Sequence, residues 1–286
     1  VIPKLLPLLQ SDEGQLALEG LWAINLSGGF TDSIASQALQ HSDPFVRMWG
    51  VRLLGDAEQV SPEIAELLAE LAEQEDHAEV RSQLAASAKR LPSSDAIPII
   101  RELLTHEVDI DDRDNPLLIW WALEAQAEAD RETVLSLLKD QSLWSNPIVQ
   151  TVLLPRIMQR YVMDRESENM LAAARLLEIA PENNLAKPLL DGLQEGLRGQ
   201  DINSLPPYVL DALQPYQSMF GEAPLALGLQ QGNPEVVDQV LDIIPNQSAS
   251  MQERLSYIRI LGEISQPKSI PVLLEVAQSE KSSGAI

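Results

Sequence analysis

The chain contains no cysteine in its 286 residues and only three histidines. The absence of cysteine excludes disulfides, thiolate nucleophiles, cysteine-ligated zinc, iron–sulfur clusters and haem attachment through a Cys-x-x-Cys-His motif. Basic residues are also scarce, because 20 Lys and Arg stand against 43 Asp and Glu, which gives a formal net charge of −23. Binding to phosphates or to anionic lipids requires clustered Lys and Arg side chains, which so acidic a chain lacks. We therefore expect no nucleic-acid partner and no direct membrane contact.

Long apolar runs and catalytic motifs are missing as well. The longest apolar cluster, Pro116 to Leu123, is far shorter than the roughly 18 residues of a membrane span. The sequence has no Gly-x-Ser-x-Gly elbow, His-Glu-x-x-His motif, phosphate loop or dinucleotide fingerprint. We therefore expect no catalytic residue, no cofactor-binding residue, no cofactor and no metal ligand in this chain.

What the sequence does contain is a strong helical pattern. A good N-cap residue stands directly before proline at five places: Asp43-Pro44, Ser61-Pro62, Asn115-Pro116, Asn146-Pro147 and Asn233-Pro234. The cap side chain accepts a hydrogen bond from a free backbone N–H, and proline at the first helical position has no N–H to leave unpaired. Apolar residues follow at helical spacing and never alternate strictly. The pattern predicts an all-α protein.

The predicted helices cover most of the chain. They span residues 2–9, 12–26, 31–39, 44–55, 62–73, 78–91, 95–105, 116–129, 131–139, 147–161, 167–180, 185–198, 206–216, 224–231, 234–243, 250–264 and 267–279.

These helices repeat with a period in the thirties. Val46-Arg47 recurs as Val80-Arg81, 34 positions on, and Pro44 recurs as Pro116 after two steps of 36. A helix pair of this length cannot bury both apolar faces alone, whereas stacked pairs form a continuous core. We predict a right-handed α-solenoid of about eight pairs that fills residues 1–286 as one domain.

We expect regular repeats over residues 1–165 and less regular ones over 166–286, with irregularities near Ser204 to Pro215 and Pro245 to Ser250. The apolar pattern is already running at Val1 and no initiator methionine precedes it. We therefore expect the chain to be a segment of a larger protein.

The order of helix, short turn and Asp43-Pro44-Phe45-Val46-Arg47 opening a second helix that ends in Leu54-Gly55 resembles the HEAT repeat. The resemblance is best over residues 31–91. It implies an α-α superhelix in which aspartate and arginine side chains form a ladder along the stack. Asp43, Arg47 and Arg81 fit that pattern, and we interpret them as structural repeat residues.

A narrower resemblance rests on three runs within residues 16–124, namely Leu16 to Ile24, His41 to Asp56 and Asp111 to Glu124 with its Pro-Leu-Leu-Ile-Trp-Trp-Ala-Leu-Glu stretch. They look like the helical middle region of bacterial planctomycete-type membrane-bound dehydrogenases. That family places a dehydrogenase-like β-propeller before the region and a c-type cytochrome module after it. The resemblance implies an extracytoplasmic or periplasmic scaffold whose parent is a dehydrogenase carrying haem c.

Two further functions remain open. The chain could be a free-standing adaptor that binds a protein or peptide, or an enzyme on a helical-repeat frame such as a lyase or a base-excision glycosylase. The net charge of −23 opposes the glycosylase, because its concave face must attract DNA.

Two features are candidate interface residues. The acidic loop from Asp109 to Asp114 contains Asp111 and Asp112, but its spacing fails the EF-hand pattern. We expect Asp114 or Asn115 to cap the helix that starts at Pro116.

Trp120 and Trp121 are adjacent and therefore point about 100° apart on a helix. Trp22 and Trp49 are predicted to pack in the core, and His41, His77 and His106 to cap or flank turns.

Overall fold

A computed structural model describes residues 1–181, 183–197, 205–219, 229, 234–246, 248–249, 251–264 and 266–279. Within these residues the chain forms 16 α-helices with short 3₁₀ segments and packs sequential helices in pairs. The predicted all-α class with helix pairs is confirmed. The chain divides into two compact units, residues 1–157 and 158–286.

Unit 1 consists mainly of two rows of helices. The first helices of successive pairs are α1 (Ile2–Leu9), α3 (Asp32–Leu39), α5 (Pro62–Gln74), α7 (Ser93–Leu103) and α9 (Arg131–Leu138). The second helices are α2 (Gly14–Leu26), α4 (Pro44–Asp56), α6 (Ala78–Ala88) and α8 (Asn115–Ala129). Short 3₁₀ helices span Glu107–Asp111 and Gln141–Ser145, and a π-helical turn spans Val149–Leu153 before α10 (Leu154–Met163).

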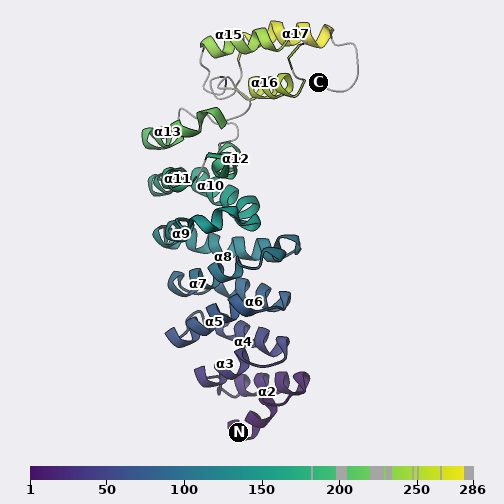
Figure 1. Ribbon diagram of the computed structural model, residues 1–286, viewed down its shortest axis with the longest axis vertical. Helices are drawn as coiled ribbons and strands as arrows, with labels where there is room; N and C mark the ends of the chain where they lie inside the picture. The colour runs from purple at the N-terminus through teal and green to yellow at the C-terminus, as the bar shows by residue number, and fades with distance from the viewer. Residues whose placement is uncertain are drawn as a thin grey trace. The chain divides into compact units, whose positions relative to one another are not determined.

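Contacts within unit 1 follow these two rows. Second helices pack on second helices, α2 on α4, α4 on α6 and α6 on α8, while α3 packs on α5, α5 on α7 and α7 on α9. Figure 1 shows the first helices α3, α5, α7 and α9 on one side of this unit and the second helices on the other. Each pair thus covers the apolar face of the next, as stacked repeats require.

The two helices of a pair approach each other closely at glycine. A Cβ atom built on Gly20 of α2 would lie 2.8 Å from the backbone nitrogen of Leu9, and one on Gly50 of α4 would lie 3.1 Å from the Cβ of Ala38. Both glycines are buried. The missing side chains let α1 pack on α2, and α3 on α4, at short range.

Unit 2 contains α11 (Ser167–Ile179), α12 (Lys187–Gly196), α13 (Pro207–Leu213), α15 (Pro234–Ile243), α16 (Met251–Glu263) and α17 (Ser269–Ser279), with 3₁₀ segments at Asn183–Ala186 and Gln214–Met219. Helix α11 packs against α13. A second apolar core contains Val237 and Val240 of α15, Tyr257 and Ile260 of α16, and Val276 of α17.

Most predicted helices agree with the structure to within a few residues. The helix predicted over 147–161 instead starts with the π-helical turn, and the one over 206–216 changes to 3₁₀ geometry after Leu213. Apart from Leu229, the helix predicted over 224–231 lies outside the described residues. The single-domain extent and the change of regularity near residue 165 stay predictions. No helix among the described residues is both long and apolar enough to span a membrane.

Candidate functional site

The most ordered polar feature of unit 1 is a ladder built around two arginines. Arg47 of α4 donates from Nε to Oε2 of Glu75 and from Nη2 to Oε1, both at 2.7 Å, and from Nη1 to the carbonyl oxygen of His41 at 2.8 Å. Arg81 of α6 repeats this geometry, donating from Nε to Oδ2 of Asp109 at 2.8 Å and from Nη1 to the carbonyl oxygen of Glu75 at 2.8 Å. Each arginine therefore links its own repeat to the next.

The ladder extends one repeat further through His41. Its Nδ1 accepts the backbone N–H of Asp43 at 2.9 Å, so Nε2 is the protonated nitrogen and donates to the carbonyl oxygen of Ser11 at 3.1 Å. Oε1 of Glu75 likewise accepts the backbone N–H two residues further on, that of His77, at 2.9 Å. Four successive turns, at Ser11, His41, Glu75 and Asp109, are thus joined by hydrogen bonds.

Charge and burial make this ladder rigid and chemically inert. The side chains of Glu75, Arg81 and Asp109 are all at most 5% exposed. Burial alone would raise the pKa of the Glu75 carboxyl, but hydrogen bonds from Arg47 and the His77 N–H outweigh it and lower that pKa. The hydrogen bond to Asp109 raises the pKa of Arg81. Glu75 and Arg81 therefore stay ionised at neutral pH, and the ladder offers no free acid or base for catalysis.

Of the three predicted repeat residues, two belong to this ladder and one caps a helix. Arg47 and Arg81 are its donors, whereas the Asp43 carboxylate accepts the backbone N–H groups of Phe45 and Val46 and caps α4. The acids of the ladder are Glu75 and Asp109. Sequence reasoning missed them as a pair, although His41, Glu75 and Asp109 recur at intervals of 34 residues.

The acidic loop before α8 serves the fold in two ways. Asp109 is held by Arg81, and Oδ1 of Asp112 accepts the backbone N–H groups of Asp114 and Asn115 at 2.9 and 2.8 Å. These two bonds lower the pKa of the Asp112 carboxyl. The predicted cap was wrong in detail, because Asp114 makes no side-chain cap bond and Asp112 takes that role. Asp111 is exposed.

The predicted pair of tryptophans on α8 splits between core and surface. Trp120 is 7% exposed and Trp121 is 45% exposed. This divergence follows from the roughly 100° between neighbours on a helix. Trp121 is therefore the member of the pair that a partner can reach.

A second aromatic group lies on α2 and α4. The rings of Trp22 and Trp49 meet edge to face with centroids 5.0 Å apart, and the guanidinium carbon of Arg52 lies 4.9 Å from the centroid of Trp49. Phe45 is 47% exposed, and its ring meets that of His77 edge to face at 5.5 Å. Both tryptophans also pack against the core of the first pairs, where we predicted them. Of these aromatic side chains, Phe45 is exposed and the two tryptophans are partly buried.

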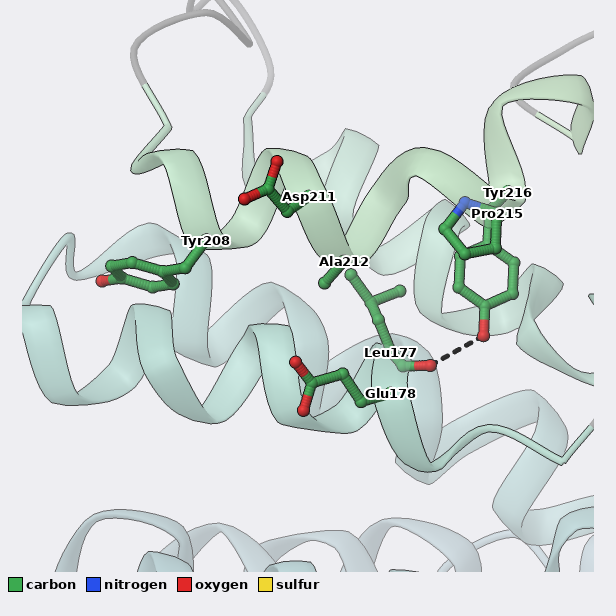
Figure 2. Close-up of a pocket in the computed structure, with 7 residues that line it drawn as sticks. All are labelled: Leu177, Glu178, Tyr208, Asp211, Ala212, Pro215 and Tyr216. Atoms are coloured by element: carbon green, nitrogen blue, oxygen red, sulfur yellow. Dashed lines mark hydrogen bonds between the residues drawn. The ribbon is translucent and has the colours of Figure 1, made fainter.

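Unit 2 contains a groove of about 440 Å³. It lies between α11 and the α13 segment, and its lining comprises Leu177, Glu178, Tyr208, Asp211, Ala212, Pro215 and Tyr216. Figure 2 shows Glu178 on the α11 side, Asp211 on the α13 side, and the two tyrosines at opposite ends. Sequence reasoning did not single out any of these residues.

The two tyrosines of the groove are fixed in different ways. Tyr216 is buried and donates from its hydroxyl to the carbonyl oxygen of Leu177 at 2.7 Å. Burial raises the pKa of its phenol, so that group stays a donor. Tyr208 is 37% exposed, and its hydroxyl donates to the carbonyl oxygen of Ser167 at 3.3 Å. Both hydroxyls therefore hold rings in place.

The histidines do not form a site. Nε2 of His106 bonds to the carbonyl oxygen of Ala72 at 2.7 Å, His41 bridges two turns, and the His77 ring meets that of Phe45 edge to face. Within the described ranges, no three His, Cys, Asp or Glu side chains are placed to hold a metal ion.

Comparison with known proteins defines the class of the first unit's core. Residues 31–115 match the family model described as HEAT repeats, so this stretch is a HEAT-repeat region. It contains both arginines of the ladder and both of their acids. Repeats of this class usually bind proteins and are usually non-catalytic. No curated protein and no solved structure matches the chain.

Proposed function

We propose that this chain is a non-catalytic scaffold that binds a protein partner along the second helices of unit 1. The observation that supports the proposal most directly is the exposure of Phe45 on α4 and of Trp121 on α8, at 47% and 45%. Both helices pack against α6, and α4 and α6 lie within the HEAT-repeat region. Large aromatic side chains held on a rigid surface are the usual anchors of protein interfaces. The ladder of Arg47, Glu75, Arg81 and Asp109 supplies that rigidity.

Affinity capture from the source organism tests this proposal. A partner recovered with the wild-type chain is purified, and its affinity is measured by calorimetry for wild type and for the variant F45A/W121A. We expect at least about a tenfold loss of affinity, because the variant removes the two anchors. The matched control is L171A, which truncates a side chain 50% exposed on α11, and its affinity should equal that of wild type. Equal affinity for F45A/W121A contradicts the proposal.

A finer proposal concerns the protein that contains this scaffold. The three runs within residues 16–124 support a position between a dehydrogenase-like β-propeller and a c-type cytochrome domain, in an exported, extracytoplasmic redox protein. The lack of cysteine agrees with a parent whose haem is attached elsewhere. The scaffold then spaces the two redox domains.

The complete reading frame of the gene tests the finer proposal. We expect propeller repeats before this segment and a Cys-x-x-Cys-His motif after it. A reading frame that ends close to both termini of this chain overturns it and favours the free-standing adaptor.

A further inference from the structure

The groove between α11 and α13 carries negative charge on both of its walls. Glu178 and Asp211 come from opposite sides, and both are exposed (Figure 2). Neither carboxylate has a cationic or hydrogen-bonding side-chain partner among the described residues. Elsewhere in the chain some acids are paired with a cation, as Glu75 is with Arg47 and Asp238 is with Lys268.

The rest of the groove suits an elongated side chain with a charged end. Ala212 and Pro215 offer apolar surface, and the ring of Tyr208 stands at one end. Methylene stems pack on apolar surface while the charged group reaches water or a carboxylate. A cation over the face of a tyrosine ring gains further attraction. The volume of about 440 Å³ lies in the ordinary range for binding pockets.

Catalysis is a poorer match for these residues. An acid–base site needs a carboxyl group removed from solvent so that it holds a proton near neutral pH. Glu178 and Asp211 are both solvent-exposed. The two exposed carboxylates on the groove walls suit the binding of a cation instead.

We propose that this groove binds a lysine or arginine side chain of a partner protein. That the cation belongs to a protein rests on the proposed scaffold function, whereas its charge follows from the groove alone. The net charge of −23 supports the same occupant, because it attracts basic segments and repels acidic ones.

A tyrosine-selective NMR titration tests this site in the full chain. The chain has four tyrosines, so ¹³C labelling of tyrosine rings gives few signals, which the variants Y208F and Y216F assign. The probes are N-acetyl-lysine methylamide, its arginine analogue and the uncharged glutamine analogue. We expect the Tyr208 ring signals to shift saturably with the two cationic probes and to stay unchanged with the glutamine probe.

Charge variants then locate the binding. In E178Q/D211N the affinity for the lysine probe should fall by about fivefold or more, since two carboxylate contacts are lost. The matched control E66Q/E70Q removes the same charge from an exposed face of α5 and should bind as wild type does. Y208F should keep the affinity because the ring remains, whereas Y208A should weaken it. The single variants E178Q and D211N serve if the double variant fails to fold.

Three results overturn the proposal: no saturable shift with the cationic probes, an equal shift with the glutamine probe, or equal loss in E66Q/E70Q and E178Q/D211N. The small probes need no protein partner, so these results are separate from those of F45A/W121A. If the groove binds the lysine probe but F45A/W121A keeps its affinity for the partner, the cation site is supported and only the proposed scaffold function is contradicted.

Discussion

At the scale of single residues, the buried ion pairs determine how firmly the first repeats are joined. Arg81 and Asp109 are 5% and 2% exposed, and two hydrogen bonds join the guanidinium to the carboxylate. Removing one member of such a pair costs more than the pair contributes, because the other charge stays buried without compensation. Unfolding of unit 1 can be followed selectively, because all five tryptophans lie within residues 1–157.

We expect D109N to lower the free energy of unfolding of unit 1 by about 3 kcal/mol, because Arg81 keeps its charge and loses its counter-ion. Urea unfolding followed by tryptophan fluorescence measures this. The control D56N breaks the exposed pair with Arg90, whose side chains are 35% and 49% exposed. It should cost less than about 1 kcal/mol. Similar losses of stability in D109N and D56N would contradict the claim that breaking the buried pair costs more than breaking an exposed one.

The acid sensitivity of unit 1 should depend on Glu75. Its carboxyl has a pKa below the ordinary value of 4.5 in the folded chain. The resulting stabilisation is therefore complete above about pH 4.5 and is lost as the pH falls through the folded value. E75Q should be less stable than wild type at pH 7, and the difference should shrink below pH 4.5. Urea midpoints from neutral to acidic pH measure it, and a difference that is constant with pH contradicts the assignment.

At the scale of the helix, side-chain caps mark where helices of both rows begin. The Asp43 carboxylate accepts two backbone N–H groups of α4. The Ser61 hydroxyl oxygen accepts one N–H at the start of α5, and the Asp130 carboxylate accepts one at the start of α9. The prolines that follow Asp43 and Ser61 need no partner for an N–H. Because capping is local, the cap–proline pairs in the sequence predicted the starts of α4 and α5.

Removing a cap side chain that accepts a backbone N–H should lower the stability of unit 1 more than removing an N-cap side chain that makes no such bond. We expect D43A to destabilise unit 1 by about 1 kcal/mol. The control is T31A, because Thr31 is the N-cap of α3 but makes no side-chain cap bond. Its effect should be a few tenths of a kcal/mol at most. Thermal unfolding followed by tryptophan fluorescence compares the two, and a larger loss in T31A would contradict the assigned cap.

At the scale of the whole molecule, the net charge of −23 opposes every compact state of the chain. Like charges repel more strongly when the chain is folded than when it is extended. Salt weakens this repulsion, because the screening length falls from about 30 Å at 0.01 M to about 8 Å at 0.15 M. The same field favours basic partners, which is the chemistry proposed for the groove of unit 2.

Stability should therefore rise with moderate salt. We expect the urea midpoint of unit 1 to increase between about 0.01 M and 0.15 M sodium chloride, as repulsion is screened. The variant E63Q/E66Q/E70Q, which removes three exposed charges of α5, should show a smaller increase. A midpoint that falls with salt, or an equal response in the variant, would mean that net repulsion does not limit stability.

Much of the fold was predictable, because helix formation depends on neighbours a few residues apart. The cap–proline pairs and the apolar spacing predicted helices 44–55 and 62–73, which the structure places at Pro44–Asp56 and Pro62–Gln74. The π-helical turn at Val149–Leu153 was not predicted, since the same apolar spacing fits an ordinary helix. Of the candidate sites, the sequence named the arginines of the ladder but not their acids.

The sequence by itself determined the all-α class, the paired helices of residues 31–115, the acidity and the absence of cysteine chemistry. Only the tertiary structure decided that Arg47 pairs with Glu75 and Arg81 with Asp109, each 28 residues away. It also decided that Trp121 is accessible while Trp120 is buried, and that Glu178 and Asp211 share one groove. The reason is physical: periodicity and capping act within one or two turns, whereas partners across a groove or a ladder depend on how separate helices stack.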